Sequence, residues 1–96
     1  MMKGEKMGDN IDQTRLSIKN DLLATVCYTS LVYQRVNKKL ATQFSELEIE
    51  KLVQAVINNA DSIVLTGKNY YVDDYQRQIS LTINAGNHRL ITANQL

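Results

Sequence analysis

The chain has 96 residues, of which 44% are hydrophobic and 22% are charged, and its formal net charge is +1. This length allows one small domain, and the composition excludes a wholly disordered chain. The charge does not indicate a strong binder of polyanions, although it leaves room for a local basic patch. No apolar run reaches the roughly 18 residues that a membrane-spanning helix needs, and the N-terminus lacks the apolar core of a signal peptide.

Cysteine usage indicates a reducing compartment. The single cysteine, Cys27, cannot form an intrachain disulfide, and a small domain without that constraint is typical of the cytoplasm. We therefore expect a cytoplasmic protein. Dimerisation is another way for a domain of this size to bury more surface.

The first third of the chain predicts a polar tail and then a helix. Residues 1–11 are polar, hold two of the four glycines, and form the expected flexible N-terminal tail. We place a single α+β domain over residues 12–96. Asp12 or Thr14 can cap its first helix, since apolar residues follow at helical spacing: Ile18, Leu22, Leu23 and Val26.

A break at residues 27–30 separates this helix from a second one. The hydroxyl of Thr29 or Ser30 can cap the second helix. Apolar residues then recur every four positions: Val32, Val36 and Leu40.

The third helix has the clearest start signal. Ser45 and Glu48 form an S-x-x-E capping box, in which each side chain satisfies a backbone N–H. Asn58 and Asn59 are poor helix formers and are expected to end it. Its buried face is predicted from the i, i+3, i+4, i+7 spacing of Ile49, Leu52, Val53, Val56 and Ile57.

After Asp61 the apolar period changes from that of a helix to that of a strand. Residues 63–65 predict either a short strand or a connecting turn. Residues 70–72, 79–84 and 88–93 have strand character, and the last two are joined by a tight connection. This order predicts an α+β fold, with two to three N-terminal helices packed on one face of a C-terminal three- to four-stranded antiparallel sheet.

Six short segments along the chain carry a resemblance: Cys27-Tyr28-Thr29, Leu31-Val32-Tyr33, Val36-Asn37-Lys38-Lys39-Leu40, Gly67-Lys68-Asn69-Tyr70-Tyr71-Val72, Thr82-Ile83-Asn84 and Arg89-Leu90-Ile91-Thr92-Ala93. Together they resemble a small bacterial family of about this length, which is a domain of unknown function. The resemblance covers roughly residues 22–96. It implies a cytosolic bacterial protein and supplies no catalytic residue.

We predict no catalytic residue, no metal site and no cofactor. Cys27 and His88 are the only soft metal ligands, and neither belongs to a spacing motif. Cys27 lies among apolar residues, where a buried and inert thiol is the usual outcome, so we assign no nucleophile. Gly67-Lys68 lacks the earlier glycines of a phosphate-binding loop. The residues therefore favour a protein that is not an enzyme.

Strand alternation predicts a polar sheet face that carries one aromatic side chain. Tyr70 and Val72 belong to the more apolar face, which leaves Tyr71 on the other. Alternation also puts His88 and Arg89 on opposite faces, which argues against their acting together in catalysis. The plain alternative is an ordinary solvated face. If the face binds a ligand, the candidate residues are Lys68, Tyr71, Arg77, His88 and Arg89.

Two classes of function fit these observations. The first is a non-catalytic interaction module of a bacterial cytosolic system, which binds a protein partner or associates with itself. The alternative is an RNA-binding protein, or a small protein resembling endoribonuclease toxins, that uses the C-terminal sheet. Small sheets bind single strands through aromatic stacking with nearby cations. We favour the interaction module.

Overall fold

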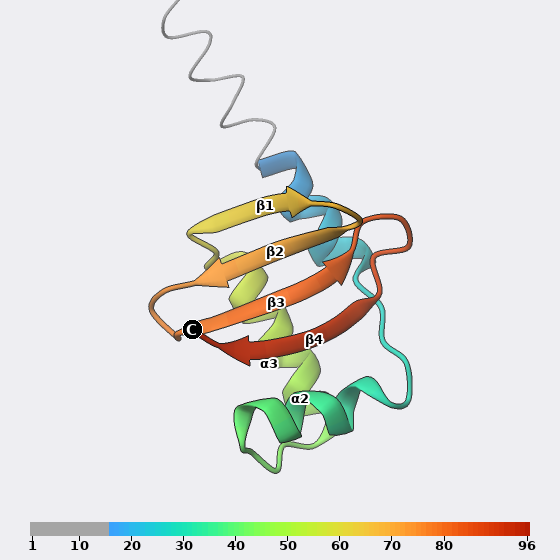
Figure 1. Cartoon of the computed structure of the whole chain (residues 1–96), viewed down its shortest axis with the longest axis vertical. Coiled ribbons are helices and arrows are strands. Elements are labelled where there is room, and N and C mark those ends of the chain that lie inside the picture. The colour runs from blue at the N-terminus through green and yellow to red at the C-terminus, as the bar shows by residue number, and fades with distance from the viewer. Residues whose placement is uncertain (1–15) are drawn as a thin grey trace, which may run out of the picture.

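A computed structural model describes residues 16–96 of the chain (Figure 1). The tail predicted over residues 1–11 and the candidate caps Asp12 and Thr14 lie outside the described residues. In the described part, three helices precede a four-stranded antiparallel sheet of order β1-β2-β3-β4. This confirms the predicted α+β fold.

The helical residues 16–25 come first, and the remaining elements follow in chain order. They are α2 (Val32–Leu40), α3 (Glu46–Asn58), β1 (Ser62–Thr66), β2 (Asn69–Asp74), β3 (Ile79–Asn84) and β4 (Leu90–Gln95). Residues 63–65, for which a strand and a turn were both open, therefore belong to a strand.

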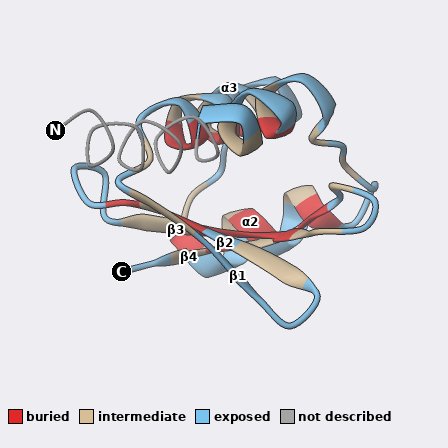
Figure 2. Cartoon of the chain, turned by 90° about the horizontal axis from the view of Figure 1, so that it is seen from above, coloured by how far each residue is buried: buried red, intermediate tan, exposed pale blue. Residues whose placement is uncertain are grey.

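The helices cover the sheet unevenly. Figure 2 shows α3 above the sheet and α2 at the level of the sheet itself. α3 packs over β2 and β3, whereas α2 packs along β4. The first helix is joined to α3 by a hydrogen bond of 3.2 Å from Gln54 Nε2 to the carbonyl oxygen of Leu23. The sheet face opposite α3 faces the viewer in Figure 1, and no described helix crosses it. We call it the open face.

The hydrophobic core lies between α3 and the sheet and extends to α2. Most residues predicted to face it from helix periodicity are buried, whereas four are only partly buried: Ile18, Leu23, Val26 and Leu52. The buried hydrophobic residues are Leu22, Val32, Val36, Leu40, Ile49, Val53, Val56, Ile57, Val72, Leu81, Ile83, Leu90 and Ala93.

The predicted capping box at the start of α3 is present. The hydroxyl of Ser45 accepts from the backbone N–H of Glu48 at 3.1 Å, and the Glu48 carboxylate accepts from the backbone N–H of Ser45 at 2.8 Å. This N–H holds the pKa of Glu48 below its usual value. The helix ends at Asn58, as predicted.

The cap predicted for α2 is wrong. Leu31 occupies the N-cap position, and no side chain caps the helix. The backbone N–H of Val32 instead donates to the carbonyl oxygen of Thr29 at 3.2 Å. A backbone turn therefore begins α2, and neither the Thr29 nor the Ser30 hydroxyl is needed.

The last strand begins two residues later than predicted. His88 has φ of 60°, in the left-handed region, so it ends the β3–β4 turn rather than starting an extended strand. Arg89 forms an isolated parallel bridge with Cys27, and β4 starts at Leu90.

The cap of α3 can be tested by its effect on stability. We expect Ser45→Ala to lower the free energy of unfolding by about 0.5–2 kcal/mol, because the N–H of Glu48 loses its acceptor. Chemical denaturation measures the change, and Ser17→Ala on the exposed side of the first helix is the control. Equal unfolding midpoints for the Ser45 variant and the native chain would contradict the cap.

Candidate functional site

Four of the five residues predicted for binding are divided between the two ends of the sheet, and the fifth, Tyr71, lies within β2. Lys68 lies in the β1–β2 turn, and its carbonyl oxygen accepts from Ala85 N–H in the β3–β4 turn at 2.8 Å. His88 and Arg89 follow the latter turn, so these three share one end of the sheet. Arg77 lies in the β2–β3 turn at the opposite end. The residues do not form one cluster.

Tyr71 lies on the open face, as strand alternation predicted. It pairs with Val64 of β1 and Thr82 of β3 in the sheet register, and it is 37% exposed, whereas its neighbour Val72 is buried. Thr82 differs from the expectation of a solvated residue, since it is only 7% exposed. It sits in an interior strand between Tyr71 and Thr92, so its neighbours shield it.

The open face carries little charge. Strand alternation assigns it the side chains opposite the core positions Val72 and Leu81. Among these, Asp73 supplies the one formal charge, and it is negative. The set is Ser62, Val64, Thr66, Asn69, Tyr71, Asp73, Ser80, Thr82, Asn84, Thr92 and Asn94.

Arg77 is held by an ion pair. Its Nη1 lies 2.9 Å from Oδ2 of Asp74, a fully buried carboxylate. Oδ1 of Asp74 accepts from Asn59 Nδ2 at 3.0 Å and from the backbone N–H of Arg77 at 3.2 Å. Burial disfavours the charged carboxylate, but the hydrogen bonds from Arg77 and Asn59 outweigh it and keep the pKa of Asp74 below its ordinary value. Arg77 therefore has a structural role that its position in the sequence did not show.

Cys27 and His88 are neighbours in space but do not form a nucleophile–base pair. The Thr25 hydroxyl donates to the carbonyl oxygen of Asp21 at 2.6 Å, so at 2.5 Å it accepts from Nδ1–H of His88. The Cys27 thiol contacts the carbonyl oxygen of Asn87 at 3.5 Å. The expectation of a buried thiol is wrong, since Cys27 is exposed.

The exposure of Cys27 follows from its backbone. Its backbone N–H donates to the backbone carbonyl oxygen of His88 at 3.0 Å, and its own carbonyl oxygen accepts from the backbone N–H of Leu90 at 2.9 Å. Cys27 thus continues the sheet beyond β4 by one bridge and is not part of the first helix. Helical spacing cannot place its side chain in the core.

Two tyrosines and a glutamate form a second cluster that the sequence did not indicate. The Tyr33 hydroxyl on α2 donates to Oε2 of Glu50 on α3 at 2.6 Å, which raises the Tyr33 pKa. The Tyr28 ring stacks on Tyr33 with 5.7 Å between centroids, and burial, aided by Glu50, raises the Tyr28 pKa to about 12. The cluster joins α2 to α3, and the buried Tyr28 hydroxyl has no hydrogen-bond partner among the described residues.

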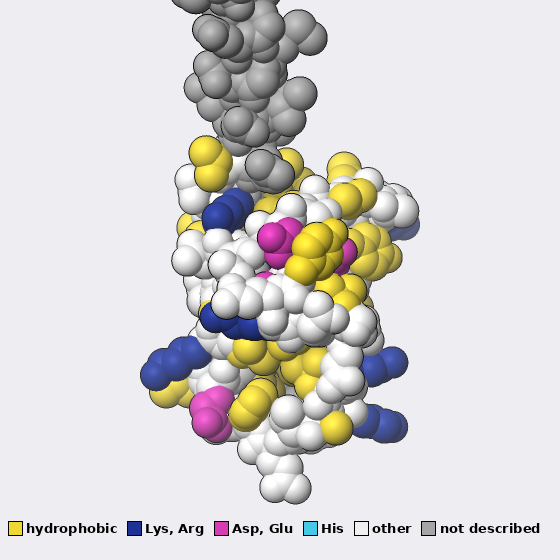
Figure 3. Space-filling model, turned by 90° about the vertical axis from the view of Figure 1, so that its left-hand side faces the viewer, with side chains coloured by type: hydrophobic (Ala, Val, Ile, Leu, Met, Phe, Trp, Pro, Cys, Tyr) yellow, Lys and Arg dark blue, Asp and Glu magenta, His cyan; other side chains and the backbone are white. Residues whose placement is uncertain are grey.

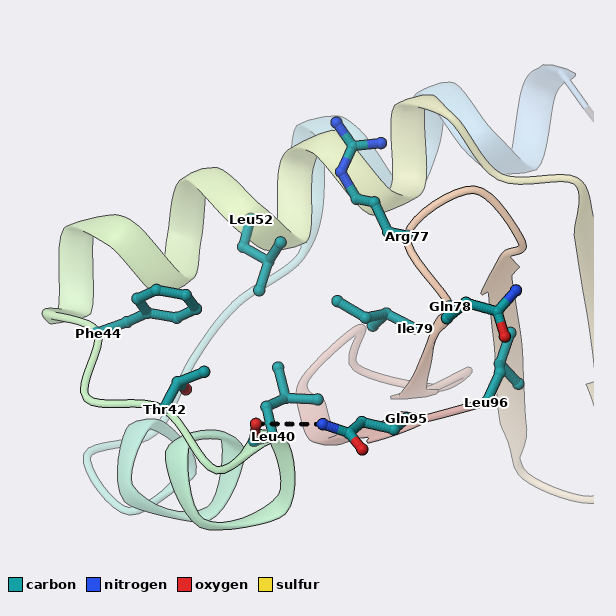
Figure 4. Close-up of a pocket in the computed structure, with 9 residues that line it drawn as sticks. All are labelled: Leu40, Thr42, Phe44, Leu52, Arg77, Gln78, Ile79, Gln95 and Leu96. Carbon is teal, nitrogen blue, oxygen red and sulfur yellow. Dashed lines mark hydrogen bonds between the residues drawn. The ribbon is translucent and has the colours of Figure 1, made fainter.

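An open apolar hollow of about 420 Å³ lies at the end of the sheet that carries the β2–β3 turn. Figure 3 views this side and shows hydrophobic side chains gathered in its middle. In Figure 4, Phe44 and Leu52 approach the hollow from above, Leu40 from below, and Ile79 from the sheet. Of the five predicted residues, Arg77 lines it. The complete lining is Leu40, Thr42, Phe44, Leu52, Arg77, Gln78, Ile79, Gln95 and Leu96.

β1 is the outer strand of the sheet, and its exposed apolar residues were not predicted as a site. Val64 is 50% exposed and Leu65 57% exposed. With Tyr71, which pairs with Val64, they form what we call the β1 patch. The sequence did contain a signal for this patch, because residues 62–66 include no charged residue. A segment of five residues was too short, however, to decide whether residues 63–65 form a strand or a turn.

The described residues also bear on metals and membranes. Within residues 16–96, no group of three or more His, Cys, Asp and Glu side chains is placed to hold a metal ion. No helix in this part of the chain has the length and apolar character required to cross a bilayer.

A family model matches residues 21–94 of the chain, and its description is "Protein of unknown function (DUF3781)". The chain belongs to this family, since the match covers most of its length. The resemblance to a domain of unknown function is thereby confirmed. No curated protein and no solved structure matches the chain.

The buried carboxylate gives a prediction about acid stability. We expect Asp74→Asn to lower the free energy of unfolding at pH 7 by about 1–3 kcal/mol, because charged hydrogen bonds are lost. The folded pKa of Asp74 lies below the unfolded value of about 3.9, so its stabilisation is present above that pH and is lost as the pH falls through the folded pKa.

Denaturation between pH 7 and pH 2 tests this linkage, with Asp73→Asn on the open face as the control. The difference in the free energy of unfolding between the Asp74 variant and the native chain should become smaller below about pH 4. A gap that stays constant across this range would show that Asp74 keeps one protonation state or makes no net contribution.

Proposed function

We propose that this protein is a non-catalytic interaction module that binds a protein chain at the β1 patch, in a bacterial cytosolic system. The observation that carries the proposal is the exposure of Val64, Leu65 and Tyr71 on and beside an outer strand. Val64 and Tyr71 lie side by side on the open face, and Leu65 is exposed on the other face of the same strand. Exposed apolar side chains around one strand are typical of protein-binding surfaces. The lone cysteine supports the cytosolic setting.

Charge favours this function over RNA binding. A sheet that binds single strands needs cations to hold phosphates beside its stacking aromatic ring. Tyr71 instead shares the open face with Asp73, and Arg77 is paired with Asp74 at the far end of the sheet. Lys68 and Arg89 remain at the other end, Lys68 in the β1–β2 turn and Arg89 after the β3–β4 turn.

The side chains near His88 also support a role without catalysis. Its Nδ1 bonds to the Thr25 hydroxyl, and its ring packs edge-on against Tyr70 at 6.3 Å. These contacts fix the imidazole against the first helix and the sheet. Packing accounts for both contacts, and neither of them requires a general base.

In-cell cross-linking tests the proposed surface. We expect a photoreactive residue in place of Tyr71 to give protein adducts in cells that make this protein. The same residue in place of Leu47, an exposed side chain on α3, should not. Adducts at both positions in equal yield would contradict a specific surface, and adducts of Tyr71 with RNA would favour the alternative.

A second test addresses RNA directly. We expect the purified protein to leave labelled single-stranded RNA intact and unbound. RNA binding that weakens with added salt and in Lys68→Ala and Arg89→Ala, but not in the α3 control Lys51→Ala, would overturn the interaction module, because phosphate contacts release counterions. Cleavage that disappears in His88→Ala would overturn it too.

A further inference from the structure

The outer edge of β1 presents backbone groups with which no strand within residues 16–96 pairs. The Ala85–Lys68 hydrogen bond shows that the backbone of Lys68 faces β3, so by alternation Asn69, Tyr71 and Asp73 face β1. A second hydrogen bond supports this direction: the Asp73 carbonyl oxygen accepts from the N–H of Asp61, just before β1, at 2.8 Å.

The register then orients β1 itself. Its partners for these three residues are Thr66, Val64 and Ser62. The N–H and C=O groups of the intervening residues, Ile63 and Leu65, therefore face away from β2. No strand among the described residues pairs with them.

The two outer strands of the sheet, β4 and β1, differ in how much of their free edge is covered. The β4 edge is covered by the Cys27 bridge and by α2. β1 lacks the usual protection of an edge strand, because its five residues, Ser62–Thr66, include no charge and no proline. Such an edge is suited to pairing with another strand.

We infer that β1 pairs antiparallel with β1 of a second copy of this chain, about a two-fold axis at Val64. This inference rests on the proposed function and names the protein partner. In this register Ile63 of each copy lies opposite Leu65 of the other. These are the residues whose backbone groups face outward, so the pairing makes four backbone hydrogen bonds and leaves none of these groups unpaired.

The side chains fit the same register. Val64 meets Val64 of the second copy as a non-hydrogen-bonded pair, where side chains lie closest. On the open face this joins the two copies of Tyr71 and Val64 into one apolar row. On the other face of the sheet, the side that carries α3, the exposed Leu65 is covered by Ile63 of the second copy.

Charge selects the antiparallel direction. Asp61 precedes the uncharged strand and Lys68 follows it, and both are exposed. Antiparallel pairing about Val64 brings Lys68 of each copy beside Asp61 of the other. Parallel pairing would bring like charges together at both ends, which is unfavourable. A second copy therefore complements this edge in shape, backbone pattern and charge.

Sedimentation equilibrium of the purified chain tests self-association. We expect a reversible monomer–dimer equilibrium that Val64→Asp weakens at least about tenfold, because it places two carboxylates opposite each other. Leu47→Asp on α3 should leave it unchanged, and circular dichroism confirms that both variants fold. A native chain that stays monomeric at ~1 mM, or a Val64→Asp variant that dimerises normally, would overturn the inference.

A cysteine scan tests the register, in a Cys27→Ser background that removes the native thiol. Val64→Cys should form an intermolecular disulfide on mild oxidation, since paired Cα atoms at this position lie about 4.5 Å apart. Thr66→Cys should not, because the two copies of residue 66 lie about 13 Å apart in this register. Equal cross-linking at both positions would contradict it.

The outcomes separate this inference from the proposed function. If Tyr71 gives adducts with a different protein while the pure chain is monomeric, the interaction module stands and self-pairing fails. If the pure chain dimerises with the predicted register but binds RNA through Lys68 and Arg89, self-pairing stands and the proposed function fails.

Discussion

Alternation of side chains across the four strands is the constraint on which the rest of the structure depends. It sends Val72 and Leu81 into the core under α3 and leaves Tyr71 on the open face. The same alternation applies to the backbone, whose hydrogen bonds point to one neighbouring strand and then the other. Side-chain exposure and outward-facing backbone groups are therefore set together, and both are the basis for proposing β1 as the surface of association.

The two edges of the sheet, at β4 and at β1, differ in how far other parts of the chain cover them. α2 packs along β4, and residue 27 adds a further bridge beyond it, so little of that edge is free. Such cover is how proteins prevent unwanted strand pairing. A chain that protects one edge with a helix and a backbone bridge, and leaves an uncharged strand at the other, is suited to pair at the second edge.

Local features of the fold could be predicted from sequence, and features set by distant contacts could not. The capping box of Ser45 and Glu48 involves residues three apart, and the period of Val32, Val36 and Leu40 reports one helix face. Cys27, by contrast, is exposed because its backbone pairs with a strand about 60 residues later. Asp74 is only three residues from Arg77, but its burial and its bond to Asn59 depend on the folded chain, so the ion pair that holds Arg77 could not be predicted.

The same distinction explains why the candidate site changed. Lys68, Arg77, His88 and Arg89 were grouped because they are basic and could surround one face of the sheet, but a meander sends alternate turns to opposite ends of the sheet. Removing Arg77 from the group leaves Tyr71 without the ring of cations that RNA requires. Val64 and Leu65 had no such charge to attract notice. Both belong to an outer strand, where Val64 lies beside Tyr71 on the open face and Leu65 is exposed on the other face. The proposal of a protein partner rests on this apolar edge.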